Sequence, residues 1–148
     1  MYEIKRYELK LEELDNIKTG VSRIGSPTDV VAIMTDCSFV TRCEEEIIVL
    51  ALSTGNEVIG VFQVAKGGVS CCLVYTNSIF RRVLLAGSEK FIVVHNHPFG
   101  SLTPSKEDTF ITHKISRACK DLDLTMLDHI IVSRNGYYSF KEHNNLYE

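Results

Sequence analysis

Stretches with an apolar or alternating pattern are separated along this chain by stretches with a helical period. Alternation and short apolar runs are typical of β-strands, and turn-forming residues separate the first two strands and the last two. The predicted strands cover residues 45–52, 57–64, 90–94, 127–133 and 137–140. The strand at 90–94 contains the fully apolar run 91–94. It is expected at the centre of a sheet, because a strand there is covered on both faces.

Three other segments carry apolar residues at helical spacing. A helix is expected over 27–37, because Ser26 suits the N-cap, Pro27 the first helical position and Asp29 the first turn. The other two helices are predicted over 77–86 and 105–122. Strands and helices interleaved in one short chain predict an α/β fold, a mixed sheet sandwiched by helices.

The ends of the chain have weaker patterns. Charged residues and alternating apolar ones in 1–20 predict an N-terminal strand and a short turn of helix. We expect 1–26 to be an extension packed on the domain, 27–142 to be the domain itself, and 143–148 to be a polar tail. Residues 69–74 are too short and mixed to assign.

Composition narrows the classes of protein that fit. A length of 148 residues, with 45% hydrophobic and 24% charged residues, is typical of one globular domain. The net charge of −3 argues against a non-specific nucleic-acid binder, although Arg81-Arg82 is a small basic candidate. The sequence contains no apolar run long enough for a membrane helix, and its first residues lack the features of a secretory signal.

The cysteines point to a reducing compartment. There are five, an odd number, and none are spaced as CxxC, so reduced thiols in a cytoplasmic protein are expected. Cys71-Cys72 is either a redox or metal pair or two ordinary strand residues that face opposite sides of a sheet.

The strongest chemical signal follows the apolar run at 90–94. His95 and His97 stand two residues apart, so on an extended segment they point the same way. Asp108 can return to them across a segment whose prolines and glycine signal a tight turn. Two imidazoles and one carboxylate leave a tetrahedral zinc one open position, as in catalytic sites. A pair of histidines alone is also compatible with two ordinary polar residues at a strand end.

With Ser105 included, the string H-x-H-P-x7-S-x2-D closely resembles the metal motif of the JAMM (JAB/MPN) metallopeptidases. Within that superfamily, HNHPFGSLTPSKED is most similar to the RadC group. The segments 50–56, 127–132 and 137–140 also resemble RadC strands and turns, so the likeness spans roughly residues 27–142. It implies a cytidine-deaminase-like α/β/α domain without the helix-hairpin-helix region of typical RadC proteins.

The resemblance implies roles for particular residues. His95, His97 and Asp108 would bind Zn²⁺, with water in the fourth position. Ser105 corresponds to the serine that donates a hydrogen bond to a tetrahedral oxyanion, although its place before a helix also suits an N-cap. Glu45 is expected to be the general base.

Other glutamates remain candidates for the base. Glu44 and Glu46 would replace Glu45 if the strand register slipped by one residue, and Glu57 is the next alternative. Each of these glutamates could instead be a solvated surface carboxylate.

The remaining histidines carry weaker signals. Asp128 or His129 could support the metal site, or both could be packed strand residues. His113 is expected to face solvent, and His143 has no expected function. Phe99 and Ser101-Leu102 depart from the usual RadC string at the rim of the site, which puts the substrate preference in question but removes no ligand.

These observations favour a zinc-dependent hydrolase of peptide or isopeptide bonds, with a peptide or protein substrate. Two alternatives stay open. One is a DNA-repair-associated protein that acts through nucleic acid or protein partners, as the RadC resemblance implies, and the other is a catalytically silent interaction module. The sequence names neither the natural substrate nor the oligomeric state.

We predict that the isolated chain binds duplex DNA only weakly. Its 16 basic residues are outnumbered by 19 acidic ones, and each phosphate contact needs a lysine or arginine. A gel-shift titration near physiological salt is the measurement. Sub-micromolar binding that resists added salt would contradict this prediction and favour the DNA-repair alternative.

Overall fold

The computed structural model describes residues 1–67 and 75–147. In this part of the chain, helices and strands alternate broadly as expected. The elements in chain order are α1 (Pro27–Asp36), β1 (Glu46–Leu52), β2 (Val58–Lys66), α2 (Tyr75–Leu85), β3 (Lys90–Asn96), α3 (Lys106–Asp121), β4 (Thr125–Ser133) and β5 (Gly136–Ser139).

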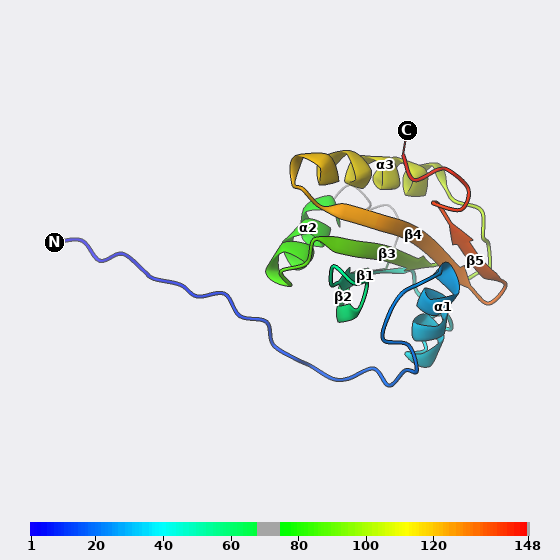
Figure 1. Cartoon of the computed structure of the whole chain (residues 1–148), viewed down its shortest axis with the longest axis horizontal. Coiled ribbons are helices and arrows are strands. Elements are labelled where there is room, and N and C mark those ends of the chain that lie inside the picture. The colour runs from blue at the N-terminus through cyan, green and yellow to red at the C-terminus, as the bar shows by residue number, and fades with distance from the viewer. Residues whose placement is uncertain (68–74, 148) are drawn as a thin grey trace.

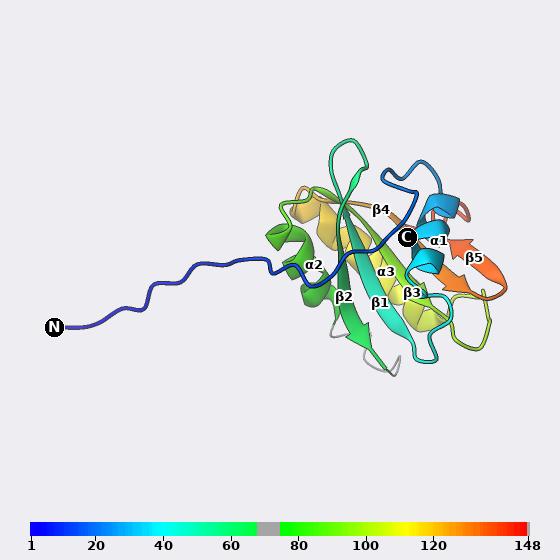
Figure 2. The ribbon, with the colours of Figure 1, turned by 90° about the horizontal axis from the view of Figure 1, so that it is seen from below.

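The five strands form one mixed sheet in the order β2-β1-β3-β4-β5. Strand β1 is antiparallel to both β2 and β3, β3 is parallel to β4, and β4 is antiparallel to β5. Helices α2 and α3 cover one face, and α1 covers the other (Figures 1 and 2). The predicted α/β fold with a mixed sheet between helices is confirmed.

Alternate side chains of the central strands enter two separate hydrophobic cores, as the two-residue period of a strand requires. The core against α2 and α3 includes Val49, Ile79, Val83, Phe91, Val93, Ile111, Ile115 and Ile131. The core against α1 includes Val30, Ile33, Met34, Ile48, Leu50, Ile92, Val94 and Ile130. Because β3 contributes to both cores, the polar residues at its end, His95 and Asn96, are also buried.

Helix α1 begins where the sequence predicts. Ser26 is the N-cap, Pro27 is the first helical residue, and the Asp29 carboxylate accepts hydrogen bonds from the backbone N–H of Gly25 and Ser26, at 2.8 and 2.9 Å. These two bonds lower the pKa of Asp29. The carboxylate therefore satisfies N–H groups that precede the helix and have no helical partner.

The two ends of the chain differ from the expectation. No strand or helix forms within residues 1–20, and residues 1–16 are exposed and extend away from the sheet (Figure 1). Within the predicted extension 1–26, Val21 and Ile24 pack against the core on the α1 side of the sheet. The segment 143–148 is more than a polar tail, because Leu146 is buried and its carbonyl accepts a hydrogen bond from Ser116 Oγ at 2.7 Å.

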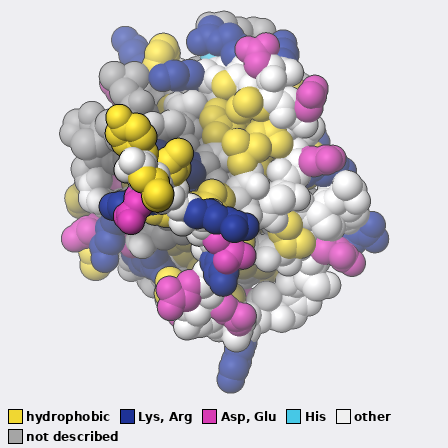
Figure 3. All heavy atoms as spheres, turned by 90° about the vertical axis from the view of Figure 1, so that its left-hand side faces the viewer, with side chains coloured by type: hydrophobic (Ala, Val, Ile, Leu, Met, Phe, Trp, Pro, Cys, Tyr) yellow, Lys and Arg dark blue, Asp and Glu magenta, His cyan; other side chains and the backbone are white. Residues whose placement is uncertain are grey.

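The surface mixes charges of both signs. On the face drawn in Figure 3, lysine and arginine side chains are interspersed with aspartate and glutamate around hydrophobic clusters. In the part of the chain that the structure describes, no helix combines the length and the apolarity that crossing a membrane requires. Cys37, Cys43 and Cys119 are free thiols, whereas Cys71-Cys72 and residues 69–74 lie outside the described residues. The cytoplasmic location stays a prediction.

We predict that Asp128→Ala destabilises the fold by about 1–3 kcal/mol, because buried donors would lose their acceptor. The buried Asp128 carboxylate accepts hydrogen bonds from Ser139 Oγ and from the backbone N–H of His129 and Lys141, which ties β4 to the chain after β5. Chemical denaturation measures the change. The exposed Asp36→Ala is the control and should alter the unfolding free energy little; equal stability of the two variants would contradict the prediction.

Candidate metal centre

The two motif histidines lie at the C-terminal end of the central strand β3. This strand extends two residues further than its apolar run, because His95 pairs with Ile47 of β1 and with Ile131 of β4. His97 follows the strand, and its backbone N–H still donates to the Val132 carbonyl at 2.9 Å. The imidazoles lie on the α3 side with ring centroids 4.6 Å apart. His95 is buried, while 12% of the His97 side chain is exposed.

The N-terminus of α3 brings a carboxylate to both rings. Ser105 is the N-cap: its Oγ accepts from the Asp108 N–H at 3.0 Å, and Asp108 Oδ2 accepts from the Ser105 N–H at 2.7 Å. This reciprocal capping box fixes the Asp108 side chain, which is buried. The Asp108 carboxylate then lies between the histidines, with Oδ1 3.6 Å from His95 Nε2 and Oδ2 3.4 Å from His97 Nε2.

These separations suit a metal ion better than direct hydrogen bonds. They exceed the usual 2.7–3.2 Å of an N–H···O bond. Ligand atoms about 2.0–2.1 Å from a tetrahedrally coordinated zinc lie about 3.3–3.4 Å from one another. The two Asp108 oxygens, one toward each histidine, therefore lie at about the distance expected between two ligands of such an ion.

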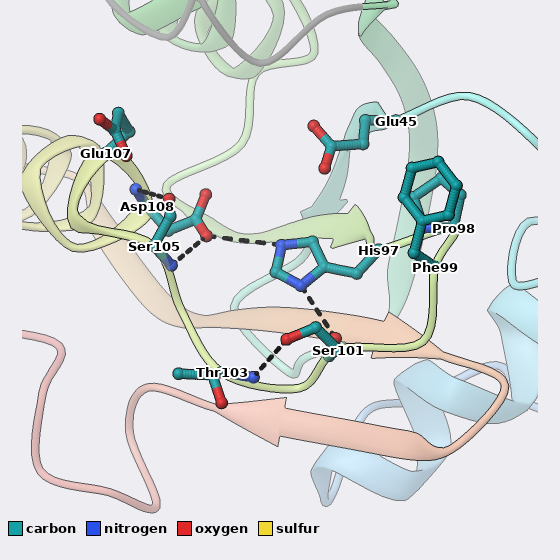
Figure 4. Close-up of a pocket in the computed structure, with 9 residues that line it drawn as sticks. All are labelled: Glu45, His97, Pro98, Phe99, Ser101, Thr103, Ser105, Glu107 and Asp108. Carbon is teal, nitrogen blue, oxygen red and sulfur yellow. Dashed lines mark hydrogen bonds and ion pairs between the residues drawn. The ribbon is translucent and has the colours of Figure 1, made fainter.

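Glu45 approaches the histidines from the residue before β1. It has the same parity as Ile47 and Val49, which pack on the α2 and α3 side, so its side chain faces the same side as His95. One ligand atom each from Glu45, His95 and His97 lies within 4.8 Å of the others. Figure 4 shows the Glu45 carboxylate directed into the space above His97 and Asp108. Its Oε2 is buried and has no hydrogen-bond partner among the described residues.

Four donors therefore converge. The ligand atoms that lie close to one another belong to Glu45, His95 and His97, whereas Asp108 presents a different oxygen to each histidine and is the third ligand that the RadC resemblance implies. An unpartnered buried carboxylate oxygen needs a proton, a water or a cation to offset its desolvation. The residues present fit a metal ion on that ground as well as by their spacing.

The alternative glutamates lie elsewhere. Glu46 faces the α1 side, where it is buried and pairs with Arg42 and Gln63. Glu44 is exposed. Glu57 precedes β2 at the hairpin end of β1, roughly 25 Å from Glu45 along the strand. The roles of ligand and base stay predictions, but only Glu45 of these four glutamates accompanies the histidines.

Asn96 is a site residue that sequence reasoning missed. Its side chain is fully buried, its Oδ1 accepts from the Glu46 N–H at 2.7 Å, and its Nδ2 donates to the Glu44 carbonyl at 2.9 Å. The amide therefore holds the backbone on both sides of Glu45. The available signal was alternation: a polar residue between two histidines on a strand must face the opposite side, where it needs partners.

The loop after His97 is fixed by the turn between β4 and β5. His97 Nδ1 lies 2.9 Å from the Ser101 carbonyl, so the ring donates there and leaves Nε2 toward Asp108 (Figure 4). Gly100 has a φ of +91°, and a Cβ there would lie 2.7 Å from Asn135 Nδ2. That same Nδ2 donates to the Gly100 carbonyl at 2.8 Å. Only glycine allows this close approach without strain.

Burial and charge distribute protons unequally over the site. Burial is the largest effect on His95 and lowers its pKa to about 4, although Asp108 opposes the shift. Burial also raises the pKa of Glu45, with a further increase from Asp108. For Asp108, burial acts to raise the pKa, but His97, His95 and Ser105 together outweigh it and hold the pKa well below its usual range. Asp108 is thus ionised at neutral pH, while Glu45 is the carboxylate that gains a proton more readily.

Comparison with known proteins identifies the family of this chain. A family model described as the RadC-like JAB domain matches residues 24–146. The chain belongs to the RadC-like JAB domain family. A protein named UPF0758 from Thermotoga maritima is 39% identical over 117 residues, which are 78% of this chain and 53% of that protein. Another UPF0758 protein, from Carboxydothermus hydrogenoformans, is 42% identical over 98 residues, 66% of this chain and 43% of that protein.

The chain spans about half the length of the curated relatives it matches. The names of these relatives state no activity.

The other histidines of the JAB domain are distributed between two locations. His129 lies beside His95, whereas the Asp128 carboxylate accepts hydrogen bonds from Ser139 at the end of β5 and from the Lys141 N–H after it. His113 was expected to face solvent, but it is half-buried and its Nε2 bonds the Asn145 carbonyl at 3.1 Å. His143 stacks on Tyr138 in the same C-terminal segment.

A pocket opens above the converged donors. It is lined by Glu45, His97, Pro98, Phe99, Ser101, Thr103, Ser105, Glu107 and Asp108. Phe99, which departs from the usual RadC string, is 91% exposed at its rim. A bound molecule would therefore meet an aromatic side chain before it reached the donors.

We predict that the purified chain binds one divalent transition-metal ion and that His95→Ala weakens binding by more than about 100-fold. Removing a ligand should cost more than the roughly 10–100-fold lost when a ligand's hydrogen-bond partner is removed. Elemental analysis and chelator competition measure occupancy and affinity. The control His143→Ala should bind like the wild type, and failure of the wild type to take up metal would contradict the prediction.

Proposed function

We propose that this JAB domain is a zinc-dependent hydrolase that cleaves peptide or isopeptide bonds. One observation carries the proposal: the unpartnered Glu45 carboxylate faces His95, His97 and Asp108 at the base of an open pocket. A carboxylate placed beside a metal-binding set and open to substrate is the arrangement that hydrolysis by an activated water requires.

The donor set favours zinc. Imidazole and carboxylate ligands with an open position are typical of catalytic zinc sites, whereas structural zinc is usually enclosed by four protein ligands. His95, His97 and Asp108 would hold the ion. Bound zinc would lower the pKa of a coordinated water to about 7 and polarise the substrate carbonyl.

Glu45 would serve as the general acid and base. In amide hydrolysis, the water oxygen attacks the carbonyl carbon while Glu45 accepts a proton from that water. The C–N bond then breaks, and the proton passes from Glu45 to the leaving amine. The raised pKa of Glu45, caused first by burial and then by Asp108, supports this role because a general base works best when its pKa approaches the working pH.

Ser105 would stabilise the oxyanion that forms during this attack. As the N-cap it uses its oxygen as an acceptor for the Asp108 N–H, so its own O–H, which also helps to lower the pKa of Asp108, would turn to donate to the oxyanion. The cap and the oxyanion donor are therefore compatible roles of one hydroxyl. The same cap holds Ser105 and Asp108 in a fixed relation.

We predict that Glu45→Gln retains zinc and lowers the hydrolysis rate by about 100-fold or more, because general acid-base catalysis typically contributes about 10²–10⁴-fold. The measurement combines zinc content with cleavage of a panel of fluorogenic peptides and of peptides joined through a lysine ε-amine. The control Glu57→Gln lies at the far end of β1 and should retain both properties.

Two outcomes would contradict the proposal. If zinc-loaded wild type cleaves neither kind of amide, the hydrolase function is wrong. If Glu45→Gln cleaves as fast as the wild type, hydrolysis takes place without the proposed base.

A further inference from the structure

His129 is a buried histidine that the proposed chemistry leaves unused. It lies on β4, is 1% exposed, and faces the same side of the sheet as His95 on the adjacent strand. The two rings are 5.7 Å apart between centroids and tilted by 33°. The ring also stacks on the buried Phe140, with centroids 4.8 Å apart and planes 7° from parallel. Its orientation is therefore fixed by packing.

Thr112 determines where the His129 proton is located. Thr112 Oγ1 lies 2.6 Å from the Asp108 carbonyl and 2.6 Å from His129 Nδ1. A carbonyl only accepts, so the single hydroxyl proton of Thr112 is donated to Asp108. The hydroxyl must then accept from His129, which carries its proton on Nδ1. His129 Nε2 is left with a lone pair, and it is buried without a partner among the described residues.

His95 has a ring nitrogen that needs a hydrogen-bond acceptor. Its Nε2 faces Asp108 Oδ1, and a metal bound at that nitrogen requires the ring proton on Nδ1. His95 Nδ1 is also buried without a partner in the part of the chain described. One ring thus holds an unpaired donor and its neighbour an unpaired acceptor. A direct N–H···N bond places two imidazole centroids roughly 5 Å apart. The separation here is 5.7 Å and the two nitrogens are not bonded in this structure, so pairing them requires the rings to move a few tenths of an ångström closer.

We propose that His129 is a positioning residue for the metal centre, in which His129 Nε2 accepts the Nδ1–H of His95 and fixes His95 in the tautomer that binds metal through Nε2. The proposal rests on the metal site of the proposed function. It closes a continuous chain from His95 through His129 and Thr112 to the backbone carbonyl of Asp108. Both ligands are therefore connected by hydrogen bonds that pass behind the metal, within the α3 side of the sheet.

The competing explanation is that His129 only fills space against Phe140. An apolar residue would serve that purpose without burying a lone pair, and unpaired buried polar groups are costly. His97 offers an internal comparison, because its Nδ1 has the Ser101 carbonyl as partner. Under our proposal, His129 supplies to His95 what that carbonyl supplies to His97.

The test compares His129→Leu with His129→Gln by Zn²⁺ affinity, measured by chelator competition. Leucine preserves apolar packing but accepts no hydrogen bond, so we expect affinity to fall by about 10–100-fold. Glutamine offers an acceptor oxygen and should restore affinity to within a few-fold of wild type. His113→Leu, which removes a half-buried histidine of α3 away from the site, is the control and should bind zinc normally.

A spectroscopic readout accompanies the affinities. Long-range ¹⁵N–¹H spectra of the zinc-loaded wild type should show both His95 and His129 as neutral rings protonated on Nδ1. Wild-type affinity in His129→Leu, weaker binding by the glutamine variant than by the leucine variant, or a proton on His129 Nε2 would each overturn the inference while leaving the metal site intact. Absence of zinc uptake by the wild type would instead overturn the metal site together with this inference.

Discussion

Strand β3 is covered on both faces, and this burial dictates how the polar groups at its end are arranged. Val93 and Val94 enter opposite cores, so the next two residues, His95 and Asn96, start from positions with little access to water. Each polar atom there must find a partner within the protein or a bound ion. Asn96 bonds the backbone around Glu45, and His95 faces Asp108. The candidate metal centre is thus built from polar groups at a buried strand end, each of which needs a partner.

Helix α3 contributes its carboxylate through its first turn. The capping box that starts the helix also orients the Asp108 carboxylate between the two imidazoles. The start of the helix and the placement of the Asp108 carboxylate therefore depend on the same hydrogen bonds, because Ser105 and Asp108 are the two members of the box. The helix body packs against the sheet and carries Thr112 one turn beyond Asp108, where its hydroxyl reaches back to the Asp108 carbonyl.

Local patterns predicted the elements well. Each strand and helix buries one face, and the spacing of its apolar residues along the sequence shows which face that is. The start of α1 followed from Ser26, Pro27 and Asp29. The choice of Glu45 over Glu46 came from the RadC resemblance, and the structure places Glu45 beside the histidines. The prediction failed where the structure of a segment depends on contacts with residues distant in sequence. Residues 1–20 have strand-like alternation but no neighbouring strand to pair with in the described structure. His113 is covered by a C-terminal segment whose return onto α3 no local pattern reveals.

The anchoring of the loop after His97 divides it into a fixed and a free part. Gly100 is held by Asn135 and the turn between β4 and β5, and His97 by the Ser101 carbonyl. The side chain of Phe99, between these anchors, is almost entirely exposed and supports nothing. Mutations at that position can accumulate during evolution without disturbing the histidines beside it. Descendants of one ancestral domain could therefore diverge in what they accept while inheriting an unchanged set of metal donors.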